Sequence, residues 1–406
     1  MSLGLAPLRR AYRGAQTLVR ATRRLGAASA TLGVRYAMAL EFPQRDDTEH
    51  LRGTIAWLCA AQDACGDGVS AAFSLAGGWD VPYPETSGYI LATFLACAGQ
   101  LRDATLEQRA RRIGDWEIAI QAPNGGVLSR PGLPATRVFN TGQVILGWLV
   151  LFEHTHDERY LDAARRAGDY LVGLQEADGT WQRDTYCGAR TYHARTAWGL
   201  LKLARVASQP RYAEAARRNL RWVMRQQRDN GWFDNCGFNA DDPITHVIDY
   251  TLIGVLESAL EEPAAFDRPP HALLARSAEA VCAIVERPGI GGIAGMIPGS
   301  FDSRWQSRDA YACLTGNAQL AYTLFRLNGL ARNTRYERAA DSLIAALKRT
   351  QALGRRVPAS VRGGLPGSFP MHTGYLANSF PNWGAKFFAD ALLASLRRGE
   401  RFAVGA

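Results

Sequence analysis

Two carboxylates lie five residues apart in a loop rich in aromatic side chains. The stretch 77–88 reads GGWDVPYPETSG and holds Asp80 and Glu85 beside Trp79 and Tyr83, directly before an apolar run. Aromatic surroundings desolvate a carboxyl group and raise its pKa, which suits a general acid or base in glycoside hydrolysis. Alternatively, the dipole of the following helix favours Glu85, at up to about 1 kcal/mol, and Asp80 is a turn residue. The residues alone leave both interpretations open.

A second acid–base pair is possible in ITHVIDY. His246 and Asp249 are three residues apart, so on a helix they share a face and could act as an acid–base or orienting pair. A buried aspartate bonded to a histidine for structural reasons is the alternative. Tyr250 follows directly and is a candidate for substrate binding.

The stretch TYHART offers an anion ligand. Arg195 could clamp the carboxylate of a uronate through two hydrogen bonds, with Tyr192 and His193 beside it. Pairing of Arg195 with one of the protein's own acids is the alternative.

Amide side chains and a further histidine complete the candidate set. Asn317 and Gln319 occur in LTGNAQ, where helix capping would also explain Asn317. Asn140, His372 and Asn382 lie in loops or at helix starts and are candidate substrate ligands. The seven cysteines are scattered without a CxxC pair, and we expect neither a metal nor a cofactor.

The elements that must position these residues form a repeat. RYLDAARRAGDYLVGLQEADGTW begins at residue 159, RYAEAARRNLRWVMRQQRDNGWF at 211 and RYERAADSLIAALKRTQ at 335. In each copy a tyrosine precedes a glutamine by fifteen residues, and apolar residues between them fall at helical spacing (Tyr160/Gln175, Tyr212/Gln227 and Tyr336/Gln351). Asp-Gly or Asn-Gly then supplies the positive φ that ends the helix.

Six glycine-marked turns are each followed by a loop and an apolar helix rich in small residues. The turns begin near residues 77, 124, 178, 230, 291 and 362. A helix that is apolar all round belongs inside, whereas the amphipathic helices before the turns belong at the surface. Six outer helices alternating with six inner ones predict an (α/α)6 toroid, over residues 43–400.

In such a toroid the loops after the turns emerge at one end, so the candidate residues form one ring. Aromatic planes stack on the C–H faces of sugars, while amides and carboxylates bind hydroxyls. We therefore expect an oligosaccharide or polysaccharide ligand.

The motifs YPETSGY, TYHARTAWGLLKL, ITHVIDYTLIGVLE, CLTGNAQLA and FPNWGAKFFADALL resemble bacterial exopolysaccharide-biosynthesis proteins of the VpsJ type, among the six-hairpin glycosidase-like toroids. The similarity runs from about residue 50 to 395. The resemblance implies a role in polysaccharide assembly or trimming; it carries no assigned catalytic residues.

Several functions share this scaffold, and among them we expect a glycoside hydrolase-like enzyme that acts on an oligosaccharide or polysaccharide. A hydrolase would use paired carboxylates, while a uronyl lyase or C5-epimerase would use Tyr, His and Arg. A non-catalytic glycan-binding member of a synthase complex is a further alternative. QEADGTW and QRDNGWF also resemble terpene cyclases and prenyltransferases, but DxDD and DDxxD motifs are absent from the sequence.

The net charge of +9 is concentrated in an N-terminal arm, residues 1–42. Residues 1–40 hold seven arginines and no acid, so the other 366 residues carry 9 − 7 = +2. A nearly neutral body argues against nucleic-acid binding. We expect a cytoplasmic protein whose arm either contacts anionic lipid or packs as a solvated helix outside the domain.

Overall fold

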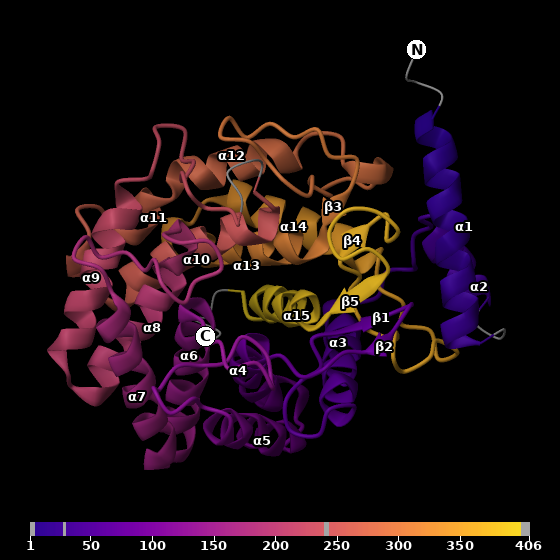
Figure 1. Ribbon diagram of the computed structural model, residues 1–406. Coiled ribbons are helices and arrows are strands. Elements are labelled where there is room, and N and C mark those ends of the chain that lie inside the picture. Colours follow the sequence, from indigo (N-terminus) through magenta and orange to yellow (C-terminus); the bar gives the residue numbers. More distant parts are fainter. Residues whose placement is uncertain (1–4, 27–29, 239–242, 399–406) are drawn as a thin grey trace.

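The computed structural model describes residues 5–26, 30–238 and 243–398, and in these it is a closed double ring of helices (Figure 1). The outer helices are α3 (Asp47–Asp63), α5 (Thr105–Ala119), α7 (Glu158–Leu174), α9 (Pro210–Met224), α12 (Ala275–Val285) and α14 (Thr334–Lys348). The inner helices are α4 (Pro84–Leu101), α6 (Val138–Thr155), α8 (Ala194–Ala207), α10 (Thr245–Glu261), α13 (Leu314–Ala331) and α15 (Asn382–Leu396). The last inner helix packs against both α3 and α4, which closes the ring and confirms the predicted (α/α)6 toroid.

Glycines bring the inner helices into close contact. A Cβ at Gly88 of α4 would lie 2.6 Å from the Val144 side chain of α6, and one at Gly142 would lie 2.7 Å from Thr196 of α8. The same holds between α10 and α8 at Gly254, and between α13 and α10 at Gly316. Three of these four contacts join the N-terminal halves of neighbouring inner helices. These helices therefore run parallel and begin at one end of the toroid, called the mouth below.

The repeated glutamines fasten each outer helix to the next. Gln175 donates to the carbonyl of Gly179, in its own turn, and to that of Ala215 in α9, while its Oε1 accepts from Arg218. Gln121 makes the corresponding bonds to Gly125, Ala163 and Arg166. The turn glycines have positive φ, 87° at Gly125 and 89° at Gly179, and lie against the backbone of the next outer helix. The Gln-x-x-Asp/Asn-Gly pattern is therefore a clasp between hairpins.

The clasp also closes the outer ring. Gln351, after α14, donates to Thr54 of α3 and to Gly363, and its Oε1 lies 2.5 Å from the ring of His50. Gln62 and Arg109 form a clasp that the repeat did not reveal. After α12 the position of the clasp glutamine is taken by Glu286, which forms an ion pair with Arg335 of α14.

Short strands and turns shape the rim of the mouth. β1 (Ala72–Ser74) pairs with β2 (Gly78–Trp79) and with β5 (Ser379–Pro381), all antiparallel. β3 (Ala312–Cys313) pairs with β4 (Ser368–Phe369). The remaining short elements are η2 (Thr191–His193), η3 (Pro263–Ala265), α11 (Pro270–Leu273) and η4 (Ile290–Gly292).

The basic arm is helical and docked on the rim. It comprises α1 (Leu5–Leu25) and α2 (Ala30–Ala37), at the right of Figure 1. The hydroxyl of Thr17 bonds Asn378 at 2.6 Å, and the buried Tyr36 ring packs edge-on against Phe380. Only part of the apolar surface of the arm is buried in this way, since five of its described large apolar side chains are exposed (Tyr12, Val19, Val34, Met38 and Leu40). The structure describes no helix long and apolar enough to cross a membrane.

Substituting Gly88 tests the close packing of the inner helices. Gly88→Ala should destabilise the fold by about 1–3 kcal/mol, because its Cβ meets both the side chain and the backbone of Val144. Gly99→Ala, in the same helix, is the matched control. A Cβ at Gly99 has nothing within 4 Å, so alanine should be neutral or stabilising by about 0.5–1 kcal/mol. Urea unfolding of the two variants checks this, and equal midpoints would contradict it.

Candidate functional site

A chain of hydrogen bonds begins at Glu85 and ends at the start of the next inner helix. The Tyr83 hydroxyl donates to Glu85 Oε2 at 3.0 Å and lies 2.7 Å from the Tyr186 hydroxyl. Tyr186 in turn donates to Asn140 Oδ1 at 2.9 Å. The amide nitrogen of Asn140 has its own partner, because Nδ2 donates to the Leu128 carbonyl. Three oxygen–oxygen contacts thus connect four side chains.

Counting protons along this chain shows which form of Glu85 it favours. Two tyrosine hydroxyls supply two protons for three contacts, and Asn140 Oδ1 can only accept. When Glu85 is ionised, one contact lacks a proton. When Glu85 is protonated, it donates to Tyr83, Tyr83 to Tyr186 and Tyr186 to Asn140, which satisfies every contact.

Burial acts in the same direction. Glu85 is the second residue of α4 and only 7% exposed, and its desolvation raises its pKa to about 7, against the Tyr83 hydrogen bond and the charge of Arg195, which lower it. Tyr186, the third side chain in this series of hydrogen bonds, is exposed to solvent. Glu85 therefore has the protonation behaviour of a general acid with a connection to solvent.

Below this layer lies a buried arginine surrounded by aromatic rings. Arg195 Nε donates to Gln143 Oε1 at 2.6 Å, and Nη2 makes no hydrogen bond within the described residues. Its guanidinium carbon lies 5.5–5.9 Å from four ring centroids, those of Tyr89, Trp198, Tyr250 and Phe387. Such contacts offset part of the cost of burying the charge.

Carboxylates from two further helices, α10 and α15, share the lumen with Arg195. Asp249 accepts from Thr323 at 2.8 Å, and its burial raises its pKa to about 7. Lys386 pairs with Asp390, four residues further along α15, which also accepts from Thr93. Gln319 makes no hydrogen bond within the described residues and, with Arg195 and Asp249, lines a cavity of about 10 Å³. That volume suits about one water molecule, so the lumen holds no sugar ring in this conformation.

His246 lies above the lumen without the partner that its spacing suggests. Its ring packs against Tyr375 and Tyr250, at centroid distances of 5.0 and 5.3 Å, and neither nitrogen makes a hydrogen bond within the described chain. Burial lowers its pKa to about 3, so it is neutral. Asp249 bonds Thr323 instead, so the expected His246–Asp249 pair is not formed. The shared helix face brings their Cβ atoms near but does not turn both side chains to each other.

The expected partnership of Asp80 with Glu85 is also not formed. Asp80 is exposed and forms an ion pair with Arg130 at 2.6 Å, besides accepting from the backbone of Val81. Trp79, on β2, packs on Trp57 and Phe73 and so stabilises the rim. Both residues lie on or directly after β2, and their described partners are rim residues rather than Glu85.

Other candidates have structural contacts. The side-chain amide of Asn317 forms hydrogen bonds with the backbone of Ile297 and Cys313, which fixes the loop before α13. Asn382 donates to the carbonyl of Ser70. His193 packs edge-on against Trp181, with burial lowering its pKa to about 3, and Tyr192 packs against Phe139.

His372 is buried in the segment between β4 and β5, and no described contact joins it to Glu85. The sequence-predicted residues that do gather at the mouth and lumen are Tyr83, Glu85, Asn140, Arg195, His246, Asp249, Tyr250 and Gln319.

Sequence reasoning missed Tyr186, Gln143, Tyr89 and Asp390. Three of these had a usable signal, because polar or hydroxylated residues at i and i+3 or i+4 recur along the apolar inner helices. Glu85/Tyr89 and Lys386/Asp390 are examples, and these stripes face the lumen. Tyr186 stands in an irregular loop and carries no such signal.

The fold is similar to that of several carbohydrate-active enzymes. An unsaturated glucuronyl hydrolase from Bacillus sp. GL1 is 15% identical with a TM-score of 0.69, over 87% of this chain and 97% of that one. A cellobiose 2-epimerase from Bacillus thermoamylovorans is 10% identical with a TM-score of 0.65, over 85% and 98%. A polysaccharide lyase is 12% identical with a TM-score of 0.62, over 88% and 99%. At these identities the likeness shows the fold alone.

Sequence comparison gives a different and shorter match. The family model of the squalene-hopene cyclase C-terminal domain matches residues 80–255. No curated protein sequence matches the chain. The matched segment contains the Gln clasps at Gln121, Gln175 and Gln227, which are structural in this protein.

The stability of a Glu85→Gln variant tests the buried carboxyl group. Its pKa rises from 4.5 to about 7 on folding, so the group costs no stability below pH 4.5, and that cost grows as the pH rises towards 7. The variant lacks this cost. Its stability relative to the wild type should therefore increase between pH 4.5 and 8, by up to about 3 kcal/mol, in urea titrations.

Glu49→Gln is the control for the helix-dipole interpretation. Glu49 is an exposed acid in the first turn of α3, as Glu85 is in the first turn of α4. Its replacement should change stability by a few tenths of a kcal/mol at most pH values. Identical pH curves for the two variants would contradict the assignment to burial.

Proposed function

We propose that this protein is a glycan-processing enzyme, glycosidase-like in chemistry, with Glu85 as its general acid. The observation that carries the proposal is the buried Glu85 carboxyl at the mouth, in a hydrogen-bond chain that is complete only when it is protonated. The similar folds of a glucuronyl hydrolase, an epimerase and a lyase support a saccharide ligand.

In a hydrolysis at this site, Glu85 gives its proton to the glycosidic oxygen as the bond to the anomeric carbon breaks. Water adds to that carbon and releases a proton to solvent. Once the product leaves and the contact between Tyr186 and Tyr83 re-forms, a proton returns to Glu85 through them. Because Glu85 is nearly enclosed, the saccharide must part the contact between these two tyrosines to reach it. Phe238, 5.9 Å from the Tyr186 ring, would move with it.

The second carboxylate in this proposal is Asp249. It is buried on the lumen side and, like Glu85, feels the charge of Arg195. The six inner-helix N-termini at the mouth add partial positive charge, which favours an anionic sugar such as a uronate. Arg195 Nη2, which makes no hydrogen bond within the described residues, would reinforce that preference.

Uronyl lyase or C5-epimerase activity is the closest alternative, because neutral His246 and the tyrosines around Glu85 could abstract a proton. A terpene-cyclase-like reaction is the next alternative, because the squalene-hopene cyclase family model matches residues 80–255. Against it, Arg195 and Lys386 already occupy the faces of the lumen aromatics that would stabilise a carbocation. A cation beside them would repel another.

The cellular role in this proposal is exopolysaccharide assembly or trimming, in the cytoplasm close to the membrane, with residues 1–42 as an arm and 43–400 as the catalytic domain. A non-catalytic glycan-binding subunit is the remaining alternative. It predicts binding of saccharide without turnover.

Turnover of acidic and neutral oligosaccharides tests the proposal. Glu85→Gln should lower the rate by about 10²–10⁴-fold while the protein stays folded. Asp80→Asn should leave the rate within about threefold, because Asp80 pairs with Arg130 outside the site. New reducing ends would indicate hydrolysis, an absorbing unsaturated uronate a lyase, and deuterium uptake at C5 an epimerase. Saccharide binding with no product in any assay would refute the enzymatic proposal.

A further inference from the structure

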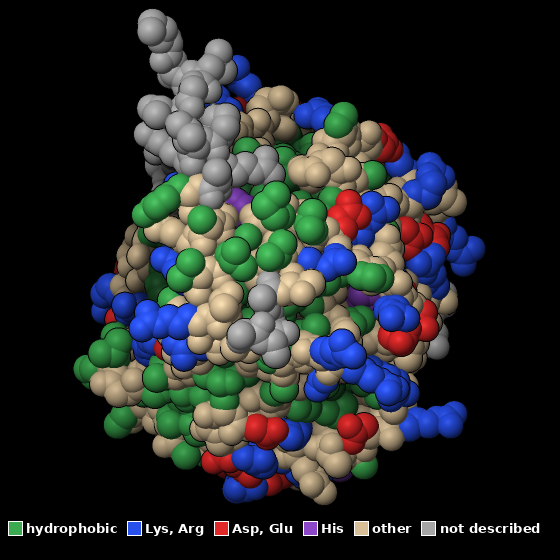
Figure 2. Space-filling view, turned by 90° about the vertical axis from the view of Figure 1, so that its right-hand side faces the viewer, with side chains coloured by type: hydrophobic (Ala, Val, Ile, Leu, Met, Phe, Trp, Pro, Cys, Tyr) green, Lys and Arg blue, Asp and Glu red, His purple; other side chains and the backbone are tan. Residues whose placement is uncertain are grey.

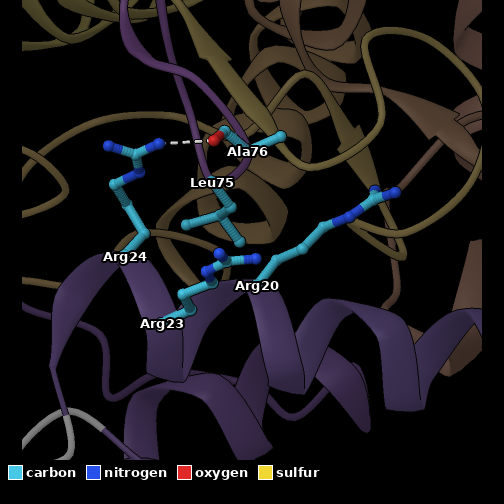
Figure 3. A pocket seen from close by; sticks show the side chains of 5 residues that line it. All are labelled: Arg20, Arg23, Arg24, Leu75 and Ala76. Carbon is cyan, nitrogen blue, oxygen red and sulfur yellow. Dashed lines mark hydrogen bonds between the residues drawn. The ribbon is translucent and has the colours of Figure 1, made fainter.

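Three arginines of the docked arm surround a surface cavity on the rim of the mouth. Arg20, Arg23 and Arg24 of α1, with Leu75 and Ala76 of the turn between β1 and β2, line a cavity of about 530 Å³ (Figure 3). The Arg24 guanidinium donates to the Ala76 carbonyl, which ties the helix to that turn.

The positive charge of this cavity is not neutralised by the protein. Arg20 and Arg23 make no hydrogen bond or ion pair among the described residues, and residues 1–40 contain no acid. Arg20 lies three and four residues before the other two, and like charges at these spacings cost about 0.2–0.5 kcal/mol per pair. Arginines of the toroid are often paired, as Arg109 is with Asp63. An uncompensated cluster facing a cavity is an anion-binding arrangement.

The cavity is fixed in place relative to the site. The arm is held by Thr17 and by the buried Ala21 and Tyr36. The turn that forms the other wall continues through β2 and Tyr83 to Glu85, and β1 pairs with β5 directly before α15. A ligand in the cavity and one at Glu85 would therefore contact the same rim segment.

We propose that this arginine cavity binds an acidic group of the saccharide chain whose reacting unit lies at Glu85. The proposal rests on the proposed function and adds a substrate class, an acidic oligosaccharide long enough to span the rim. The chemistry recognised is a carboxylate, sulfate or phosphate on that chain, because planar guanidinium groups bind all three.

An anionic membrane is the competing occupant. Tyr12 and Val19 of the arm are 65% and 64% exposed. Apolar and basic side chains mix on the face of the molecule seen in Figure 2. The observations favour the saccharide, because the arginines line a cavity against the toroid and the Arg24 guanidinium is bonded to the Ala76 carbonyl in the wall of that cavity.

Binding to an inactive protein tests the proposal without relying on turnover. In the Glu85→Gln background, Arg20→Gln/Arg23→Gln should weaken binding of a galacturonate hexasaccharide about tenfold at low salt and reduce its salt dependence. Binding of a neutral maltohexaose should not change. Arg102→Gln/Arg332→Gln removes the same charge from two exposed arginines at the far ends of α4 and α13, and should leave both affinities unchanged.

Equal hexasaccharide affinity in the two double variants would overturn the proposal, as would no hexasaccharide binding by the parent protein. If either result were found but the protein still turned over a neutral glycan, the proposed enzymatic function would be supported and only the arginine-cavity proposal would be wrong. Loss of binding to phosphatidylglycerol vesicles in the Arg20/Arg23 variant, with unchanged hexasaccharide binding, would assign the cavity to a membrane instead.

Discussion

Closure of the helical ring is the constraint on which the rest of this structure depends. The clasp from Gln351 to Thr54 and His50 joins the last hairpin to the first, and its counterparts at Gln121 and Gln175 set the same step between the others. Each clasp satisfies backbone carbonyls at a helix end, which would otherwise stay unpaired. Inside, glycines remove the Cβ atoms that would hold the inner helices apart. An open array of the same hairpins would place the site residues on separate surfaces.

Closure also explains why so many charges can be buried. Arg195, Asp249, Lys386 and Asp390 come from three inner helices and would each be costly in an apolar interior. In the lumen they face one another and hydroxyl groups such as Thr323, so most of their bonding capacity is used. The exceptions are Arg195 Nη2 and the Gln319 amide, which have no described partner. Polar groups left without partners beside a mouth are the places where a ligand gains most by binding.

The fold leaves the reaction open, because hydrolase, epimerase and lyase structures share it. Within this chain, the choice depends on how protons and charges are arranged above the lumen. The Glu85–Tyr83–Tyr186–Asn140 chain favours a protonated acid, whereas the cations among the aromatic rings disfavour a carbocation. The arm adds a second concentration of positive charge at the same rim. In the function proposed above, these features favour an acidic saccharide as the ligand.

The sequence by itself determined the toroid, since the Gln-Gly turns, the amphipathic outer helices and the apolar inner helices are local patterns repeated along the chain. It also picked out Glu85 and Arg195, which stand at inner-helix starts. Only the tertiary structure decided their partners. Asp80 and Asp249 are both carboxylates near helix starts, yet the first is exposed and paired with Arg130, while the second lies in the lumen. Tyr186 contacts Tyr83, the partner of Glu85, across 103 positions of sequence from an irregular loop, and no periodicity specifies such a contact. Spacing fixes which residues share a face; packing between distant segments fixes what that face meets.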